Sequence, residues 1–220
     1  MKHILDFLKI LSANNNREWF ALHKEEYLEV KRQADDLARR LIALVATVDP
    51  EAAPLRVADC TYRIYRDTRF SADKTPYKTH IGIFVNPPRG KKGLTCGYYL
   101  HLEPNNVFFA AGTIGHPAPV LKAIRQSVYD EIDEYRSIVD DPAFRRIFPE
   151  VGDSPLKTAP KGFPKDWPYI DYLKPRNFVA SGPFAPCSLD GDTFETSLLP
   201  AVRQAYRFNR FINFTIEDFD

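Results

Sequence analysis

The densest group of charged side chains lies between residues 63 and 80. Two carboxylates, Asp67 and Asp73, stand there among a larger set of cations. These cations are Arg63, Arg66, Arg69, Lys74 and Lys78. An arginine presents a rigid fork of donors that matches a carboxylate or a phosphate, and Ser71 and Tyr77 add hydroxyl donors. The segment therefore predicts a binding site for a small anionic ligand that carries a phosphate or a carboxylate.

Groups suited to proton transfer stand in the same segment and beyond it. They are Asp67, His80, His101 and Glu103. Imidazole and carboxylate side chains are the usual general acids and bases. Residues two apart in a strand share a face, so pairing of strands at 59–67, 80–86 and 95–103 would gather these groups with Arg63 on one polar face. Gly82 and Gly97 are expected to leave space above that face.

Metal ligands and other cofactor motifs receive less support from the sequence. His80, His101, Glu103 and His116 are suitable ligand types, and two histidines with a carboxylate suit iron or an open zinc site. A His-x-Glu pair on one strand is nevertheless a weak signal. We therefore assign no metal ligand and predict no cofactor. Nucleophile elbows, Walker loops and dinucleotide-binding glycine motifs are all missing from the sequence.

Periodic spacing of apolar residues predicts helices at both ends of the chain. The expected helices cover residues 3–12, 17–48, 117–138 and 142–148, with a last one from about Asp192. Glu195 suits a capping box with Asp192, and Pro200 should kink or restart that helix. Residues 149–190, rich in proline and aromatic side chains, are expected to form an ordered excursion over the surface.

The pattern of residues in the middle of the chain, about 59–112, predicts strands. Short runs rich in Tyr, Phe, Ile and Val are separated by turn-like stretches, and Pro104-Asn105-Asn106 is typical of a tight hairpin. The runs cover residues 59–67, 80–86, 95–103 and 107–112. Helices, then strands, then helices indicate an α+β fold, with an antiparallel β-meander flanked by long N- and C-terminal helices. We expect residues 1–220 to form a single domain, because no low-complexity linker divides them.

Composition sets the broad class of protein. The 220 residues carry a net charge of +1, so no global attraction to nucleic acid or anionic membrane is expected. No apolar run approaches the roughly 20 residues of a membrane span. The three cysteines, Cys60, Cys96 and Cys187, are scattered and are expected to be buried free thiols of a cytoplasmic protein. Oligomeric state is not determined by the sequence.

Three functions remain open at this point. The basic segment could serve an enzyme or a binding protein for a small anionic ligand. It could instead belong to a module that binds nucleic acid or protein through its basic turns and residues 157–176; a pI near 7.7 makes nucleic acid the weaker partner. In the third reading the motif is structural, since Asp67 and Asp73 can pair with neighbouring arginines.

Four stretches resemble a bacterial family known as domain of unknown function 2461. They are Asn15 to Phe20, Tyr65 to His80, Gly97 to Pro104, and Lys157 to Phe163. The resemblance spans nearly the whole chain and implies the family's single-domain fold. It implies no activity, because that family has no assigned reaction and no established catalytic residues. His23 stands where the resemblance leads us to expect asparagine, so it receives no catalytic role.

Overall fold

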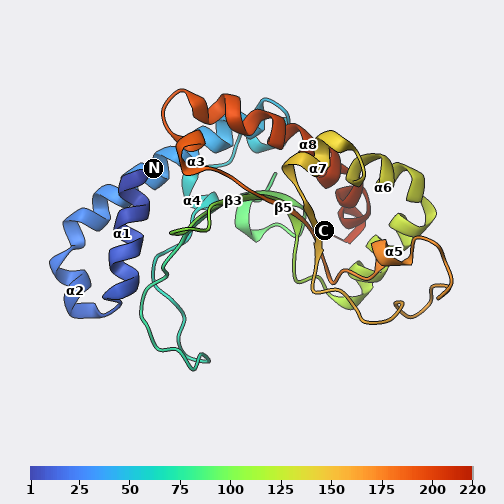
Figure 1. The fold of residues 1–220 in the computed structure, drawn as a ribbon, viewed down its shortest axis with the longest axis horizontal. Helices are drawn as coiled ribbons and strands as arrows, with labels where there is room; N and C mark the ends of the chain where they lie inside the picture. Colours follow the sequence, from blue (N-terminus) through green and yellow to red (C-terminus); the bar gives the residue numbers. More distant parts are fainter. Residues whose placement is uncertain (220) are drawn as a thin grey trace.

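The computed structural model describes residues 1–219 as an arch built on one antiparallel sheet (Figure 1). The strands are ordered β1-β2-β3-β5-β4. Their bounds are β1 Ile81–Val85, β2 Gly97–Leu102, β3 Phe108–Thr113, β4 Glu150–Asp153 and β5 Asn177–Pro183. Helices precede and follow the strands of the meander. The predicted α+β fold, with a mid-chain antiparallel meander between long terminal helices, is thereby confirmed.

The β1-β2-β3 meander follows the predicted alternation. Pairing runs through Ile83↔Leu100 and Leu100↔Phe109, and these side chains are fully buried on one face. The turn from β2 to β3 closes through a bond from Asn106 N to the Glu103 carbonyl oxygen of 3.0 Å. Asn105 sits there at φ 64°, in the left-handed region that asparagine tolerates.

Strand β5 lies, like β4, within residues 149–190, where only an ordered excursion over the surface was expected. It pairs with β3 on one side and β4 on the other, with Phe178 and Ala180 buried. Small residues and a closing proline hide its alternation of buried and exposed positions. Gly152 lies at φ 84° where the register between β4 and β5 shifts, a conformation that glycine adopts without strain.

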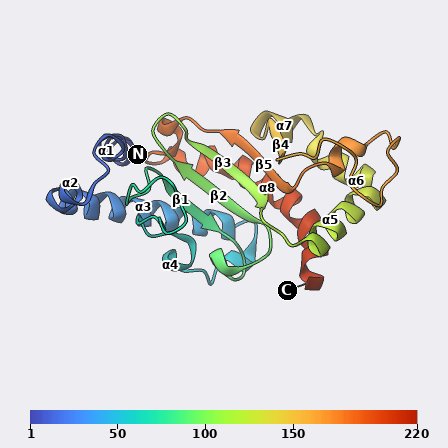
Figure 2. The same ribbon diagram turned by 90° about the horizontal axis from the view of Figure 1, so that it is seen from below.

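Two long helices bury one face of the sheet. Helix α8 covers Thr193–Ile216 and packs on β2 and β3, while α3 covers Lys24–Ala46 and packs on β1. Both lie above the sheet in Figure 1. In Figure 2 the strands lie in front of these helices, and no helix stands between them and the viewer. The sheet therefore has one helix-covered face and one open face.

The predicted helix over 17–48 is wrong as a single element. Helix α2, Arg17–Leu22, ends at His23, where α3 begins. The His23 ring stacks on Trp19 at 3.9 Å, and its Nδ1 lies 2.8 Å from the Trp19 carbonyl oxygen. This local contact breaks the helix although the apolar spacing continues through it. Helix α1, Lys2–Ala13, agrees with the expectation for 3–12.

The C-terminal helices also differ in detail. The stretch predicted at 117–138 forms α5, Ala118–Asp130, and α6, Ile132–Val139, and α7 follows at Pro142–Ile147. Helix α8 continues through Pro200 without a break. The predicted capping box does not form: the Asp192 side chain makes no cap bond, and the Glu195 carboxylate is paired with Arg40 at 2.7 Å. The remaining short helices are α4 Val57–Cys60, η1 Pro50–Ala52, η2 Gly90–Lys92, η3 Ile170–Leu173, η4 Pro186–Leu189 and η5 Glu217–Phe219.

The strand predicted at 59–67 is also wrong. Only single bridges form there, Thr61↔Ile83 and Tyr65↔Tyr77. Arg66 N donates to the Pro76 carbonyl oxygen at 2.9 Å, so the chain pairs with itself instead of extending the sheet. The result is a long loop, residues 63–80, which projects from the sheet below the arch (Figure 1). We call this segment the basic hairpin.

Two further expectations can be compared with the structure. Cys60 and Cys96 are buried free thiols as expected, but Cys187 is exposed. Among the helices described between residues 1 and 219, none is long and apolar enough to cross a bilayer.

Helix α8 offers a test of the core. Phe208 is 0% exposed and packs on Tyr135 and Phe144, whereas Phe214 on the same helix is 78% exposed. Phe208→Ala should lower the free energy of unfolding by about 3–5 kcal/mol in urea denaturation. Phe214→Ala, the matched control, should change it by no more than about 0.5 kcal/mol. Equal effects would contradict this packing.

Candidate functional site

A pocket of about 1320 Å³ occupies the open face of the sheet. Its walls include Gly82 and Phe84 of β1, Tyr99 of β2, Phe108 of β3 and Ser181 of β5. From the basic hairpin come Arg63, Tyr65, Lys78 and His80. Binding sites usually combine such an apolar lining with a few convergent polar groups. This pocket is therefore the candidate site.

Aromatic rings form the floor of the pocket. A Cβ added to Gly82 would lie 2.5 Å from the Tyr99 hydroxyl oxygen, and one added to Gly97 would lie 2.4 Å from Phe84 Cε2. The two glycines thus do not leave open space, contrary to the sequence-based expectation. They let the Tyr99 and Phe84 rings lie against the backbone. Tyr99 also contacts Phe108, with 5.9 Å between ring centroids.

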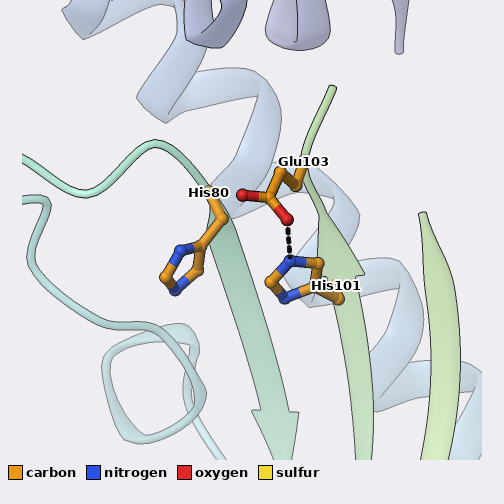
Figure 3. Close-up of side chains that lie close together, drawn as sticks. All are labelled: His80, His101 and Glu103. Atoms are coloured by element: carbon orange, nitrogen blue, oxygen red, sulfur yellow. Dashed lines mark hydrogen bonds and ion pairs between the residues drawn. The ribbon is translucent and has the colours of Figure 1, made fainter. Parts of the chain in front are cut away.

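Three of the four predicted proton-transfer residues come together at the β1–β2 end of the pocket (Figure 3). His101 is buried, and its Nε2 lies 3.3 Å from Glu103 Oε2. Its Nδ1 lies 2.9 Å from the Tyr99 hydroxyl. The His80 ring stacks on His101 with centroids 4.9 Å apart. Alternation along β2 brought His101 and Glu103 to one face, as predicted.

The fourth candidate, Asp67, lies apart from this cluster. It accepts from Arg69 at 2.6 Å within the basic hairpin, and this bond holds the pKa of Asp67 below its usual value. It does not line the pocket. Its expected place beside His80 required a strand at 59–67, which the chain does not form.

Burial and hydrogen bonds tune the clustered groups. Burial, together with the neighbouring His101, lowers the pKa of His80, so its imidazole is neutral at pH 7. A bond from Asn106 and contact with His101 lower the pKa of Glu103, which is ionised. Burial raises the pKa of Tyr99 to about 12, so it keeps its proton. The cluster thus contains the neutral imidazole of His80 and the carboxylate of Glu103.

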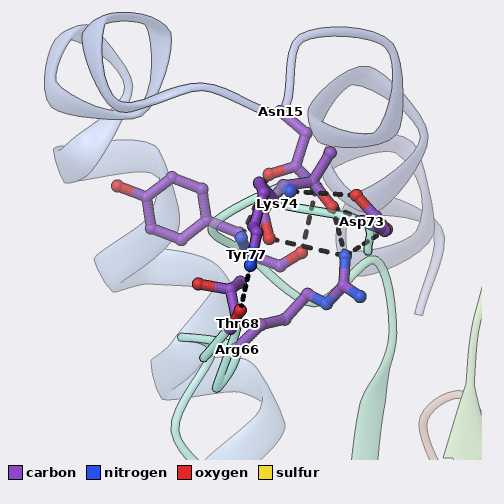
Figure 4. Close-up of polar contacts among 7 residues, drawn as sticks. Asn15, Arg66, Thr68, Asp73, Lys74 and Tyr77 are labelled. Carbon is purple, nitrogen blue, oxygen red and sulfur yellow. Dashed lines mark hydrogen bonds and ion pairs between the residues drawn. The ribbon is translucent and has the colours of Figure 1, made fainter. Parts of the chain in front are cut away.

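Most cations of the basic hairpin are engaged within the hairpin itself (Figure 4). Arg66 donates to Asp73 and to the Thr75 hydroxyl. Lys74 Nζ donates to the Thr68 carbonyl oxygen at 2.9 Å. Together with the Arg69–Asp67 pair, these contacts stabilise the loop. Arg66, Arg69, Ser71 and Lys74 do not line the pocket.

Tyr77 also has a structural position. It is buried, and its ring stacks on Phe20 with 4.0 Å between centroids. Asn15 holds its backbone, accepting from Tyr77 N at 3.1 Å and donating to its carbonyl oxygen at 2.9 Å (Figure 4). These contacts fasten the hairpin to the N-terminal helices, and the predicted hydroxyl donor therefore lies outside the pocket.

A second group of cations does line the pocket, around Tyr62. Lys78 Nζ donates to the Arg63 carbonyl oxygen at 2.9 Å, and Lys91 Nζ to the Ala58 carbonyl oxygen at 2.6 Å. Both ammonium groups lie over the Tyr62 ring, at 5.3 and 5.6 Å from its centroid. Burial, then the charges of Arg63 and Lys91, lower the pKa of Lys78. We call Arg63, Lys78 and Lys91 the rim cations.

Among the side chains that the structure describes, which exclude those of Asp218 and Asp220, no carboxylate forms an ion pair with a rim cation. The nearest acidic neighbours are committed elsewhere: Asp59 to Arg56 and Asp67 to Arg69. Lys91 and Tyr62 were not among the predicted site residues. Lys91 lies in the turn from Gly90 to Gly93, which the sequence shows. The sequence does not show that this turn packs beside residues 58–63, where Lys91 bonds to the Ala58 carbonyl oxygen.

Two acidic side chains of the pocket lie at the edge opposite the rim cations. Glu150 and Asp153 belong to β4, and β4 is four strands from β1 in the sheet order. Neighbouring strands lie about 4.8 Å apart, which separates the two edges by roughly 19 Å. Asp35, also in the lining, is paired with Lys31. Positive charge at the rim is therefore not neutralised from within the pocket.

Fold and site together define an α+β protein with an arched sheet, one helix-covered face and one open, aromatic pocket face. The chain belongs to the family described as conserved hypothetical protein (DUF2461), which matches residues 3–211. The resemblance seen in the sequence is thereby confirmed. Neither a curated protein nor a solved structure matches the chain.

The stabilisation of the basic hairpin by Asp73 should decrease in acid. The backbone N–H of Thr75, followed by Arg66, lowers the pKa of Asp73 to about 2, against about 3.9 in an unfolded chain. A lowered folded-state pKa stabilises the protein above about pH 4, and the effect is lost as the pH falls toward 2. In urea denaturation, Asp73→Asn should lower stability at pH 7 and flatten its decline between about pH 4 and 2. Parallel curves for both proteins would show that Asp73 makes no such contribution.

Proposed function

We propose that the open-face pocket binds a small anionic ligand, whose phosphate or carboxylate group contacts the rim cations Arg63, Lys78 and Lys91. The observation that carries this proposal is the gathering of three cations beside an aromatic floor, with no ion-paired carboxylate among the described side chains. Like charges held together raise the free energy of the unliganded protein. An anion placed between them removes that repulsion.

The proposal narrows the site suggested by the sequence. Of the seven predicted anion-binding residues, Arg63 and Lys78 remain, and Lys91 is added. Arg66, Arg69, Lys74 and Tyr77 are assigned to holding the basic hairpin in place, and Ser71 lies outside the pocket lining. Asp67 is likewise assigned to the hairpin, where it pairs with Arg69. The motif thus divides into a structural part and a ligand-binding part.

The floor of the pocket supports a ligand with a flat or apolar body. Phe84, Tyr99 and Phe108 line it, and rings of this kind bury apolar surface and stack on planar groups. Tyr62 places its ring beneath two ammonium groups, which holds them near the pocket mouth. The anionic group would thus sit at the β1 edge and the rest of the ligand over β2 and β3.

The pocket also has a group that can accept a proton. His80 lines it, and His101 and Glu103 lie behind His80. In an enzyme, His80 would transfer a proton to or from the bound ligand, which is the usual role of an imidazole. A binding protein would use the same rim cations without that step. The rim cations therefore carry the proposal in both cases.

Ligand binding can be tested with matched charge variants. Phosphate- and carboxylate-bearing metabolites are screened for an increase in melting temperature, since a ligand that binds only the native state stabilises it. For a hit, isothermal titration calorimetry should show that Arg63→Gln and Lys91→Gln each weaken binding about tenfold or more, the value of one charged hydrogen bond. Lys92→Gln, next to Lys91 but outside the lining, is the control and should bind like the unmodified protein.

Other outcomes contradict the proposal. A loss of affinity in Arg69→Gln, without one in Arg63→Gln, would move the site to the tip of the basic hairpin. A chain that no anion stabilises, but that binds RNA with a steep dependence on salt, would favour the nucleic-acid alternative.

A further inference from the structure

We propose that His80, His101 and Glu103 bind a divalent transition-metal ion such as Zn²⁺ at the β1–β2 end of the pocket. One ligand atom from each residue can be chosen so that all three atoms lie within 4.8 Å of one another. Figure 3 shows the three side chains converging from β2 and from the residue before β1. This inference uses none of the rim cations and does not depend on the anion site; it gives His80 the role of a metal ligand in place of a proton-transfer group.

The spacing of two ligand atoms already matches a metal centre. A zinc ion holds nitrogen and oxygen ligands at about 2.0–2.1 Å, so two ligands at a tetrahedral angle lie about 3.3 Å apart. His101 Nε2 and Glu103 Oε2 are separated by 3.3 Å. The third atom, on His80, needs to approach by at most about 1.5 Å. A turn of one side chain about its own torsions covers that distance.

The backbone fixes the three residues at the correct places. His101 and Glu103 are two residues apart on or next to β2 and so share a face. The antiparallel register pairs Ile81 with Leu102, and extending it by one residue sets His80 opposite Glu103. Directly opposed residues have Cβ atoms about 4.5–5.5 Å apart. The sheet therefore presents the ligand set on a rigid support.

Neighbouring groups orient the ligands. The His101 Nδ1 lies 2.9 Å from the Tyr99 hydroxyl, which can accept its proton and leave the Nε2 lone pair for a metal. The His101 ring is held between His80 and Phe108, with 4.9 and 4.6 Å between centroids. Asn106 Nδ2 donates to Glu103 Oε2 at 2.9 Å. Such outer contacts are a regular part of metal sites.

The ligand types select the class of ion. Two imidazoles and one carboxylate suit Zn²⁺, Fe²⁺ or Co²⁺, whereas Mg²⁺ and Ca²⁺ prefer oxygen ligands throughout. Three protein ligands leave at least one coordination position for water or substrate. His80 lines the pocket, so the ion would sit at its wall and the free position would be accessible from it.

Isothermal titration calorimetry with ZnCl₂ on chelator-stripped protein tests the inference. One ion per chain should bind, and His80→Ala and Glu103→Gln should each weaken binding at least about tenfold. Tyr99→Phe, which removes only the orienting hydroxyl, should cost about 10- to 100-fold. His116→Ala is the matched control, because His116 lines the same pocket but bonds to Thr113 at 2.7 Å. Its affinity should be unchanged, as should that of Arg63→Gln.

Several results would overturn the inference. They are the absence of zinc binding, zinc binding that survives both His80→Ala and Glu103→Gln, and an equal loss in His116→Ala. MgCl₂ in the same titration should give no binding, and binding as tight as that of zinc would contradict the assigned ligand chemistry. Circular dichroism of each variant checks that the fold is retained. The rim variants separate this test from the anion site, since a chain can pass one test and fail the other.

Discussion

Burial of one face of the sheet by α3 and α8 is the constraint on which the rest of the structure depends. Leu100 and Phe109 lose all exposure beneath these helices, and apolar burial of this kind is the main favourable term in folding. The opposite face receives no helix in the arrangement of Figure 2. Aromatic rings that lie over glycines cover this face instead, as the Tyr99 ring does over Gly82. An aromatic pocket is the consequence.

The sequence predicted much of this fold because periodicity reports burial directly. Alternation along 81–85 and 97–102 matches the faces of β1 and β2, and the break at Asn105 matches the hairpin turn. Strand β5 escaped prediction because Ala180 and Gly182 give little contrast between its faces. The strand expected at 59–67 failed for a different reason: its residues found hydrogen-bond partners inside the basic hairpin, such as Pro76 for Arg66.

The candidate site was predictable only in part, and the division has a physical cause. His101 and Glu103 share a face by strand geometry alone, so the sequence could bring them together. Which arginines were free to meet a ligand depended on ion pairs such as Arg66–Asp73, and composition does not show them. Lys91 joined the rim through packing of a turn 28 residues beyond Arg63 in the chain. In the basic hairpin, Arg66 and Arg69 are held in internal ion pairs, whereas Arg63 and Lys78 line the pocket. Both groups of residues lie on the same loop.

The account is tested most directly by locating a bound anion. Crystals soaked in tungstate, a phosphate-like anion with a strong anomalous signal, would show where it binds. An anomalous peak among the Arg63, Lys78 and Lys91 side chains, on the open face of the sheet, is the predicted result. A peak at Arg66, Arg69 and Lys74, with none at the rim cations, would contradict the account.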